Sequence, residues 1–390
     1  MLALYRKYRP HRFEDVIGQD HIIDVLKNAI LARRIAHAYL FSGPRGVGKT
    51  TVARLLARAV NCTTFAADSG EGRVAVNLTD VSTKLVAERP QPPVNFPDIP
   101  CNECENCKAL QIGFTLDIIE IDAASTGGVD EVRSLREAVQ LMPLRASYKT
   151  YIIDEVHMLS RAAFNALLKT LEEPPLHAIF VLATTEPEKV PDTVISRTQH
   201  FRFRRVGEPL IIQSLQTIAK AEGISIDQEA VSLLAVFADG SLRDGQSMLD
   251  QVLNASKKHA EGAVVRALFG APPAEVIEQF LGALLRRQTE EALTSVTQVA
   301  DSGTEMRLFL KLSLRDLRAI LLLHLAPKLA ESSLAAYGKK EASFLRELKT
   351  QTSLEDAERF YAGLLEAYDM LHTFALPHAA VELAIAKLLK

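Results

Sequence analysis

A glycine-rich stretch near the start of the chain has the residue types and the spacing of a phosphate-binding loop. It runs from Gly43 to Thr50 and matches the pattern G-x-x-x-x-G-K-[ST] at every fixed position. Its glycines let backbone N–H groups point at phosphate oxygens, Lys49 would reach the β- and γ-phosphates, and the Thr50 hydroxyl would hold Mg²⁺. The expected ligands are therefore ATP and Mg²⁺. The predicted nucleotide-binding residues are Gly43, Pro44, Arg45, Gly46, Val47, Gly48, Lys49, Thr50 and Thr51.

The sequence on both sides of this loop supports the same interpretation. The apolar residues Ala38–Phe41 precede it and predict a buried strand, and Thr51–Val60 follow with the periodicity of a helix. A helix that begins at the loop adds the partial positive charge of its N-terminus to the phosphate site. A glycine-rich turn with a chance lysine is the alternative, and the strand–loop–helix setting disfavours it.

Two adjacent acids follow a second apolar run, Thr150–Ile153, at the point where a strand would end. Asp154 would orient Mg²⁺, directly or through water, and Glu155 would polarise the water that attacks the γ-phosphate. A strand followed by a solvated acidic turn is the alternative. The phosphate-binding loop in the same chain favours the hydrolytic interpretation.

Three further side chains could take part in the same chemistry. Thr184, followed by Thr185, ends an apolar run, where a hydroxyl can hydrogen-bond the γ-phosphate or the attacking water, although strand ends often carry Thr for its β propensity alone. Arg197 is either an ordinary ion-pair partner or an arginine finger that completes a neighbouring subunit's site in trans. Arg243, near the start of a predicted helix, is either a surface residue or a second arginine that touches the bound nucleotide.

All four cysteines of the chain are candidates for one metal site. Cys101, Cys104 and Cys107 form a tight C-x-x-C-x-x-C cluster, and Cys62 is the only other cysteine. Four thiolates with these spacings indicate a tetrahedral structural Zn²⁺ site, whereas two disulfides are disfavoured in a cytoplasmic chain. The long separation of Cys62 from the others weakens its case as fourth ligand, but the closure cost of a long loop grows slowly, so the site is feasible.

The patterning divides the chain into three predicted parts. Residues 1–207 alternate strand-like runs with helical periods, which predicts a parallel sheet with helices on both faces. Residues 208–258 and 259–390 are helical in pattern, and the last part, which carries no catalytic signature, is expected to be a packing or assembly module. The first part contains a predicted zinc module at 62–107 with a proline-rich insertion at 63–100. Its strand candidates are Ala38–Phe41, Asp117–Ile121, Thr150–Ile153, Ala178–Thr184 and His200–Arg204.

Composition limits the modes of partner binding. The chain has 390 residues and a net charge of −3, so nucleic acid would have to meet a local basic surface or helix N-termini. Trp is absent and aromatic residues make up 6%, which disfavours base stacking on an aromatic platform. No apolar run has the length of a membrane span, and the charged N-terminus is unlike a signal peptide, so no membrane contact and a cytoplasmic location are expected.

In this order, the motifs resemble those of the gamma/tau family, the ATPase subunits of the clamp loader of bacterial DNA polymerase III. The resemblance covers about residues 1–255, and the remainder is similar in character to the family's helical collar. The segments that carry it are Tyr5–Pro10, Phe13–Gln19, His37–Thr50, Asp154–Pro175, Ser196-Arg197, Gly240–Asp244 and Leu376–Ala384.

The resemblance implies an AAA+ nucleotide-binding domain at 1–207, a helical lid at 208–258 and a helical oligomerisation collar at 259–390. It implies that ATP binding opens a sliding clamp for loading on primer–template DNA, and that hydrolysis releases the clamp. The implied catalytic residues are Asp154, Glu155, Lys49, Thr184 and, from the neighbouring subunit, Arg197, with Arg243 as a second sensor of the nucleotide.

The implied partners are delta, delta-prime and further gamma subunits, the sliding clamp, and the phosphate backbone of primer–template DNA, with action at the nucleoid. Candidate DNA contacts are the helix N-termini near 127–129 and 160–161. Contact with the polymerase core is expected only if a longer form exists, because the chain stops at Lys390 like a short gamma form or a fragment.

Two departures from the family pattern stand out. Thr198 follows Ser196-Arg197 where the family usually has Cys, and the 63–100 insertion is unusual. Another DNA-dependent ATPase of the same superfamily, such as a branch-migration motor, is the alternative function. The cysteine cluster and the Asp154–Pro175 block disfavour that alternative.

Overall fold

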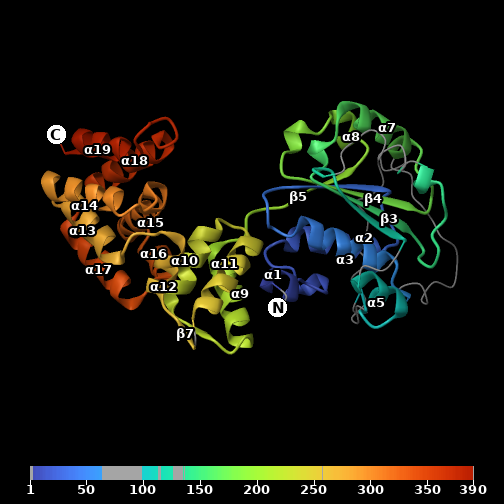
Figure 1. Ribbon diagram of the computed structural model, residues 1–390, viewed down its shortest axis with the longest axis horizontal. Coiled ribbons are helices and arrows are strands. Elements are labelled where there is room, and N and C mark those ends of the chain that lie inside the picture. Colours follow the sequence, from blue (N-terminus) through green and yellow to red (C-terminus); the bar gives the residue numbers. More distant parts are fainter. Residues whose placement is uncertain are drawn as a thin grey trace. The chain divides into compact units, whose positions relative to one another are not determined.

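The computed structural model describes residues 3–63, 99–112, 116–125, 135, 137–256 and 258–389. They form two compact units. The first contains the chain up to Leu210 together with Asp239–Asp244, and the second contains Ile211–Ala238 and the chain from Gly245 onward (Figure 1). Most of the predicted insertion at 63–100 lies outside the described residues.

The first unit is built on a parallel sheet of five strands in the order β2-β3-β4-β1-β5. All five predicted strands are confirmed, with ends that differ by at most two residues. Strands β1 and β4 are buried along their whole length, as expected when helices cover both faces of a parallel sheet. The strands are β1 Ala38–Ser42, β2 Ile118–Asp122, β3 Lys149–Asp154, β4 Ala178–Thr184 and β5 Gln199–Arg202.

Side chains of alternate strand residues enter two separate cores. Tyr39 and Phe41 of β1 belong to the core shared with α2 and α3, whereas Ala38 and Leu40 belong to the core shared with α7. Figure 1 shows α2 and α3 on one side of the sheet and α7 on the other. The predicted fold, a parallel sheet with helices on both faces, is thus confirmed. The helical segments of this unit are α1 Leu4–Lys7, η1 Phe13–Asp15, α2 Asp20–Leu31, α3 Lys49–Val60, α5 Glu105–Ile112, η3 Val156–Met158, α7 Arg161–Glu172, η4 Pro187–Lys189 and α8 Asp192–Ile195.

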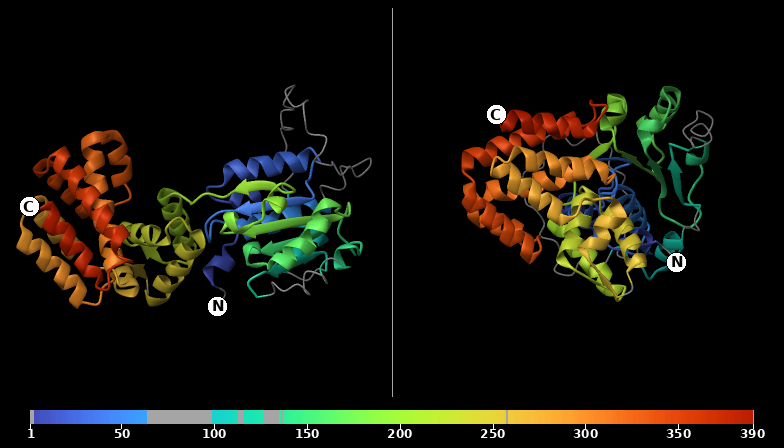
Figure 2. Two further views of the ribbon diagram at one scale, coloured as in Figure 1. Left: turned by 90° about the horizontal axis from the view of Figure 1, so that it is seen from above. Right: turned by 60° about the vertical axis from the view of Figure 1, so that its left-hand side comes forward.

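The second unit is mostly helical, as the periodicity predicts (Figure 2). Prolines start two of its helices, since a residue without an N–H is tolerated in a first helical turn. The remaining helices of the chain are α9 Glu208–Ala221, α10 Gln228–Ala238, α11 Leu242–Ala255, α12 Gly262–Phe269, α13 Ala274–Leu285, α14 Thr289–Asp301, α15 Met306–Leu325, α16 Pro327–Leu334, α17 Lys339–Gln351, α18 Leu354–Met370 and α19 Pro377–Leu388.

A short parallel pair, β6 Ser225–Ile226 with β7 His259–Ala260, departs from the helical expectation for 208–258. Strands of two residues are too short to show a periodicity in the sequence. Long-range hydrogen bonds hold the pair, since the Ser225 N–H and hydroxyl both donate to the carbonyl oxygen of Lys258. Among the described helices, none combines the length and apolar character needed to cross a membrane.

Candidate nucleotide and metal sites

The predicted phosphate-binding loop lies between β1 and α3, with three of its glycines in the left-handed region. Gly43, Gly46 and Gly48 have φ values of 141°, 74° and 105°. A Cβ atom added to Gly46 would lie 1.9 Å from the Ser241 hydroxyl oxygen, so a side chain does not fit there. Helix α3 starts at Lys49 with Gly48 as its N-cap and no capping side chain. Its first N–H groups are therefore available to an anion.

Lys49 is almost fully buried in the loop, and its ammonium group donates to the carbonyl oxygens of Gly43 and Pro44, both at 2.7 Å. Burial lowers the pKa of Lys49, while the nearby charges of Glu155 and Asp154 oppose that shift. A buried ammonium held by neutral carbonyls is well placed for an anionic oxygen, a stronger acceptor of charge-assisted hydrogen bonds.

The two predicted Mg²⁺ ligands meet although they are far apart in the sequence. Thr50 opens α3, Asp154 ends β3, and the Thr50 hydroxyl donates to a carboxylate oxygen of Asp154 at 2.7 Å. A hydroxyl and a carboxylate side by side are the oxygen ligands that Mg²⁺ prefers beside a triphosphate. The described residues therefore fit the predicted ion.

Glu155 is held in an unusual backbone conformation directly after the strand. Its φ of 49° and ψ of 45° lie in the left-handed region, which costs energy for a residue other than glycine. Its N–H donates to Asp154 at 3.0 Å, and its carboxylate accepts a hydrogen bond from the Thr185 hydroxyl, also at 3.0 Å. These contacts fix the acid that is expected to act on water.

The hydroxyl beside this acid belongs to Thr185, the residue that follows the predicted catalytic candidate Thr184. Thr184 is fully buried, and its hydroxyl accepts from the N–H of Glu186 and lies 3.0 Å from the imidazole of His157. The sequence points to the Thr184-Thr185 pair, whereas His157 is not among its predicted site residues. The Thr-Thr pair is a signal in itself, because side chains of successive residues at a strand end point in opposite directions, so the two hydroxyls face different neighbours.

Arg197 has no partner within the described phosphate-binding loop. Its guanidinium forms an ion pair with Glu172 at 2.7 Å and donates to the carbonyl oxygen of Thr193 at 2.8 Å. Both partners belong to neighbouring helical segments, and the Arg197 side chain is partly exposed. The described contacts therefore leave the Arg197 guanidinium partly accessible to solvent.

The backbone of Arg243 contacts the phosphate-binding loop. Its N–H donates to the carbonyl oxygen of Gly46 at 3.4 Å, and its guanidinium lies 5.0 Å from the ring centre of Tyr5, at cation–π distance. Ser241, whose hydroxyl caps the helix by accepting from the Asp244 N–H, packs against the same glycine. The structure thus joins the 239–244 segment to the loop.

The four cysteines converge as the spacing predicts. Their Sγ atoms all lie within 4.8 Å of one another, and Cys101 and Cys107 are 3.9 Å apart. Tetrahedral Zn²⁺ with four thiolates has Zn–S bonds of about 2.3 Å and hence needs such S–S separations. The N–H of Cys104 points at Cys101 Sγ and that of Cys107 at Cys104 Sγ, at 3.3 and 3.4 Å. The donor set therefore fits zinc, with N–H groups that would support the ligating thiolates.

A buried arginine accompanies the cysteines. Arg58 of α3 donates to Asn102, and its Nε atom is buried without a hydrogen-bond partner among the described residues. Burial lowers the pKa of Arg58, and the four cysteines oppose that shift. A positive charge at this place would offset the negative charge of a zinc ion with four thiolates.

One of the two expected DNA contacts lies within the described residues. Ser160 caps α7 by accepting from the Ala163 N–H at 3.2 Å, and Arg161 is exposed in its first turn. Residues 127–129 lie outside the described residues.

Three family models match successive parts of the chain. Residues 18–80 and 67–207 match "DNA polymerase III, delta subunit", and residues 210–258 match "DNA polymerase III clamp loader subunit, ATPase lid domain". Residues 261–390 match "DNA polymerase III subunits gamma and tau domain III".

Curated proteins of several bacteria are similar over most of the chain. DNA polymerase III subunit tau of Bacillus subtilis is 42% identical over 84% of this chain and 53% of its own length. The tau subunit of Escherichia coli is 37% identical over 93% and 51%. The gamma subunit of Buchnera aphidicola is 36% identical over 77% and 75%. The chain thus spans about half the length of the two tau relatives.

Among solved structures, the branch-migration motor RuvB of Thermotoga maritima superposes with a TM-score of 0.45 and 16% identity, over 71% of this chain and 79% of RuvB.

Proposed function

Since this chain belongs to the family of DNA polymerase III gamma and tau subunits, we propose that it is an ATP-hydrolysing clamp-loader subunit that opens a sliding clamp and loads it on primer–template DNA. The contact between Thr50 and Asp154 carries the proposal, because it joins the phosphate-binding loop to the acidic strand end. We propose a nucleotide-binding domain at 1–207, a lid at 208–258 and a collar at 259–390, acting at the nucleoid in the cytoplasm.

In the proposed reaction, the loop N–H groups and Lys49 bind the phosphates, while Thr50 and Asp154 hold Mg²⁺. Glu155 orients and polarises the attacking water and accepts its proton. Arg197 of the neighbouring subunit stabilises the charge that develops on the transferred phosphoryl group. Arg243 would report the presence of the γ-phosphate to the rest of its helix, which makes the lid sensitive to the nucleotide.

The proposed partners are delta, delta-prime and further gamma subunits, the clamp, and the DNA backbone. Purified chain, assembled with those subunits, should hydrolyse ATP faster when clamp and primed DNA are present together. A pull-down from the native cell should recover the clamp and delta-type subunits. ATP turnover that DNA alone stimulates fully, with no effect of the clamp, would contradict the proposal and favour a DNA motor.

The hydrogen bond between Thr185 and Glu155 is expected to matter for turnover. Thr185→Val removes the hydroxyl and keeps the shape, so it should lower the rate constant for ATP hydrolysis by about tenfold while ATP affinity is kept. Thr185→Ser, the matched control, keeps the hydroxyl and should retain most of the activity. Steady-state hydrolysis measured at saturating ATP checks this, and equal rates for wild type and Thr185→Val would contradict it.

We also propose that the cysteines bind structural zinc. Elemental analysis of fresh, reduced protein should give about one Zn²⁺ per chain. Cys107→Ser should lower that ratio and destabilise the first unit, because Cys107 is buried among core residues. A ratio far below one in the wild-type protein would exclude the site.

A further inference from the structure

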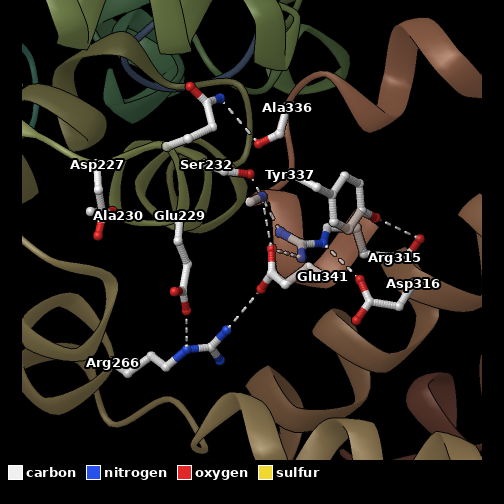
Figure 3. Close-up of polar contacts among 12 residues, drawn as sticks. Asp227, Glu229, Ala230, Ser232, Arg266, Arg315, Asp316, Ala336, Tyr337 and Glu341 are labelled. Atoms are coloured by element: carbon white, nitrogen blue, oxygen red, sulfur yellow. Dashed lines mark hydrogen bonds and ion pairs between the residues drawn. The ribbon is translucent and has the colours of Figure 1, made fainter. Parts of the chain in front are cut away.

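Six polar side chains form a largely buried ionic cluster inside the second unit, with Glu229 as its most exposed member (Figure 3). The cluster consists of Glu229, Arg266, Arg315, Asp316, Tyr337 and Glu341. Its members come from α10, α12, α15, the start of α17 and, for Tyr337, the segment between α16 and α17. Nothing in the proposed ATP chemistry uses these residues.

Arg266 lies at one end of the cluster and is only 7% exposed. Its Nε forms an ion pair with Glu229 at 2.8 Å, and its Nη2 forms another with Glu341 at 3.3 Å. Its Nη1 donates to the carbonyl oxygen of Pro272 at 2.8 Å. Each of the three guanidinium nitrogens thus contacts a different partner in one plane, an arrangement that a lysine ammonium cannot reproduce.

Arg315 occupies the other end. It pairs with Asp316 at 3.1 Å, and its guanidinium carbon lies 4.2 Å from the ring centre of Tyr337. The Oε2 atom of Glu341 lies 3.9 Å from Arg315 Nη2, while its Oε1 atom pairs with Arg266. Glu341 therefore bridges the two arginines (Figure 3). Arg315 also reaches the hydroxyl of Ser232 at 3.5 Å.

These contacts cross from one family-matched segment to the next. Glu229 and Ser232 lie on α10, inside the 210–258 segment that matches the ATPase lid, whereas both arginines and Glu341 lie inside the 261–390 segment. Two more hydrogen bonds cross the same junction. Lys311 donates to the carbonyl oxygen of Val236 at 2.7 Å, and Gln228 donates to that of Ala336 at 3.2 Å.

Helix α11 links this junction to the residue expected to sense ATP. Arg243 is in the first turn of α11, and two residues later Gly245 packs so tightly that an added Cβ would lie 3.3 Å from the Cβ of Ala238 on α10. Glu229 and Ser232, which contact the two arginines of the cluster, lie on the same helix α10. Within the second unit, close packing thus runs from Gly245, two residues after Arg243 in the chain, through α10 to the cluster.

Buried ion pairs suit a junction that must keep one geometry. They are directional, and loss of one partner leaves a buried charge uncompensated, so sliding or opening of the junction is strongly opposed. An apolar interface of the same size would repack more easily.

We propose that Arg266, Arg315 and Glu341 are positioning residues that lock the lid segment to the C-terminal helices, so that an ATP-dependent movement of α11 reaches those helices instead of being absorbed at the junction. This inference rests on the proposed function of Arg243. It concerns how the signal leaves the ATP site, and it assigns no step of hydrolysis to the cluster.

The test compares hydrogen exchange of the full chain with and without a hydrolysis-resistant ATP analogue and Mg²⁺. In the wild type, the analogue should change exchange in α10 and also in α15 and α17. In Glu229→Gln, which removes the lid-side charge, the change should remain in α10 and fall by about tenfold or more in α15 and α17. Glu331→Gln is the matched control, because it breaks an exposed pair with Arg346 that does not cross the junction. It should behave like the wild type.

Loss of structure is distinguished from loss of coupling by two further measurements. Nucleotide affinity of Glu229→Gln should stay within about twofold of the wild type, since no cluster residue belongs to the ATP site. If that variant does not fold, Ser232→Ala removes another lid-side contact, the one with Arg315, and should show the same direction of effect. Unchanged transmission to α15 and α17 in the folded variants, or none in the wild type, would overturn the proposal. Wild-type transmission without any clamp-dependent turnover would instead contradict the proposed function and leave the junction proposal intact.

Discussion

Replacement of Lys49 by alanine is expected to abolish ATP binding, with Kd rising by at least about 100-fold. The ammonium group of Lys49 is buried and touches two loop carbonyls, so its surroundings already exclude water. A charge-assisted bond to phosphate in such a site contributes about 3 kcal/mol, and each 1.4 kcal/mol is a factor of ten in Kd. Calorimetric titration of the purified chain with ATP and Mg²⁺ measures the change.

The control for this prediction is Lys27→Ala, which removes a lysine paired with Glu14 at the surface of the first unit. Its ATP affinity should match that of the wild type. Lys49→Ala itself should fold normally, because a buried ammonium costs desolvation energy that alanine does not. A Kd within tenfold of the wild-type value for folded Lys49→Ala would show that the loop binds phosphate by another means.

Removal of the arginine finger is the second change with a large expected effect. Arg197→Ala should leave ATP binding intact and lower clamp- and DNA-stimulated turnover by about 10³-fold, the scale of other arginine fingers. Within its own chain Arg197 contacts Glu172 and Thr193, outside the phosphate-binding loop, so the loss would appear only in the assembled complex. Single-turnover hydrolysis with labelled ATP measures it.

A mixing experiment makes the trans assignment sharper. Assemblies that contain only Arg197→Ala chains, or only Glu155→Gln chains, are expected to be inactive. Mixed assemblies should regain activity at the interfaces where an intact Glu155 faces an intact Arg197. Glu172→Gln, which removes only the ion-pair partner, should keep most of the stimulated turnover. Normal turnover of Arg197→Ala in the complete complex would refute the finger assignment.

The sheet and the phosphate-binding loop were predictable because their signals are local. A parallel strand buried on both faces is a continuous apolar run, as in Ala178–Thr184, and turn residues mark its ends. The meeting of Thr50 with Asp154 followed from the same logic, since strand ends of one parallel sheet share an edge. The convergence of the four cysteines likewise followed from their spacing, since the closure cost of a long intervening segment grows slowly with its length.

Other features depend on which way a side chain points in the folded chain. Thr185 rather than Thr184 reaches Glu155 because the strand end sets the direction of each hydroxyl, which composition does not reveal. The ionic cluster joins Glu229 to Arg266 and Glu341 across more than a hundred residues. Lys, Arg and Glu on helices are usually solvent-facing, so the pattern gives no sign that Arg266 is buried and its partners largely so.

The left-handed backbone of Glu155 has a consequence for how such a chain evolves. Asparagine, which adopts this conformation more readily than glutamate, would relieve about 1 kcal/mol of strain there but would lack the carboxylate that is expected to polarise water. Selection for thermal tolerance alone would therefore drive this position away from glutamate. Retention of glutamate at position 155 in a population would therefore indicate continued selection for ATP hydrolysis.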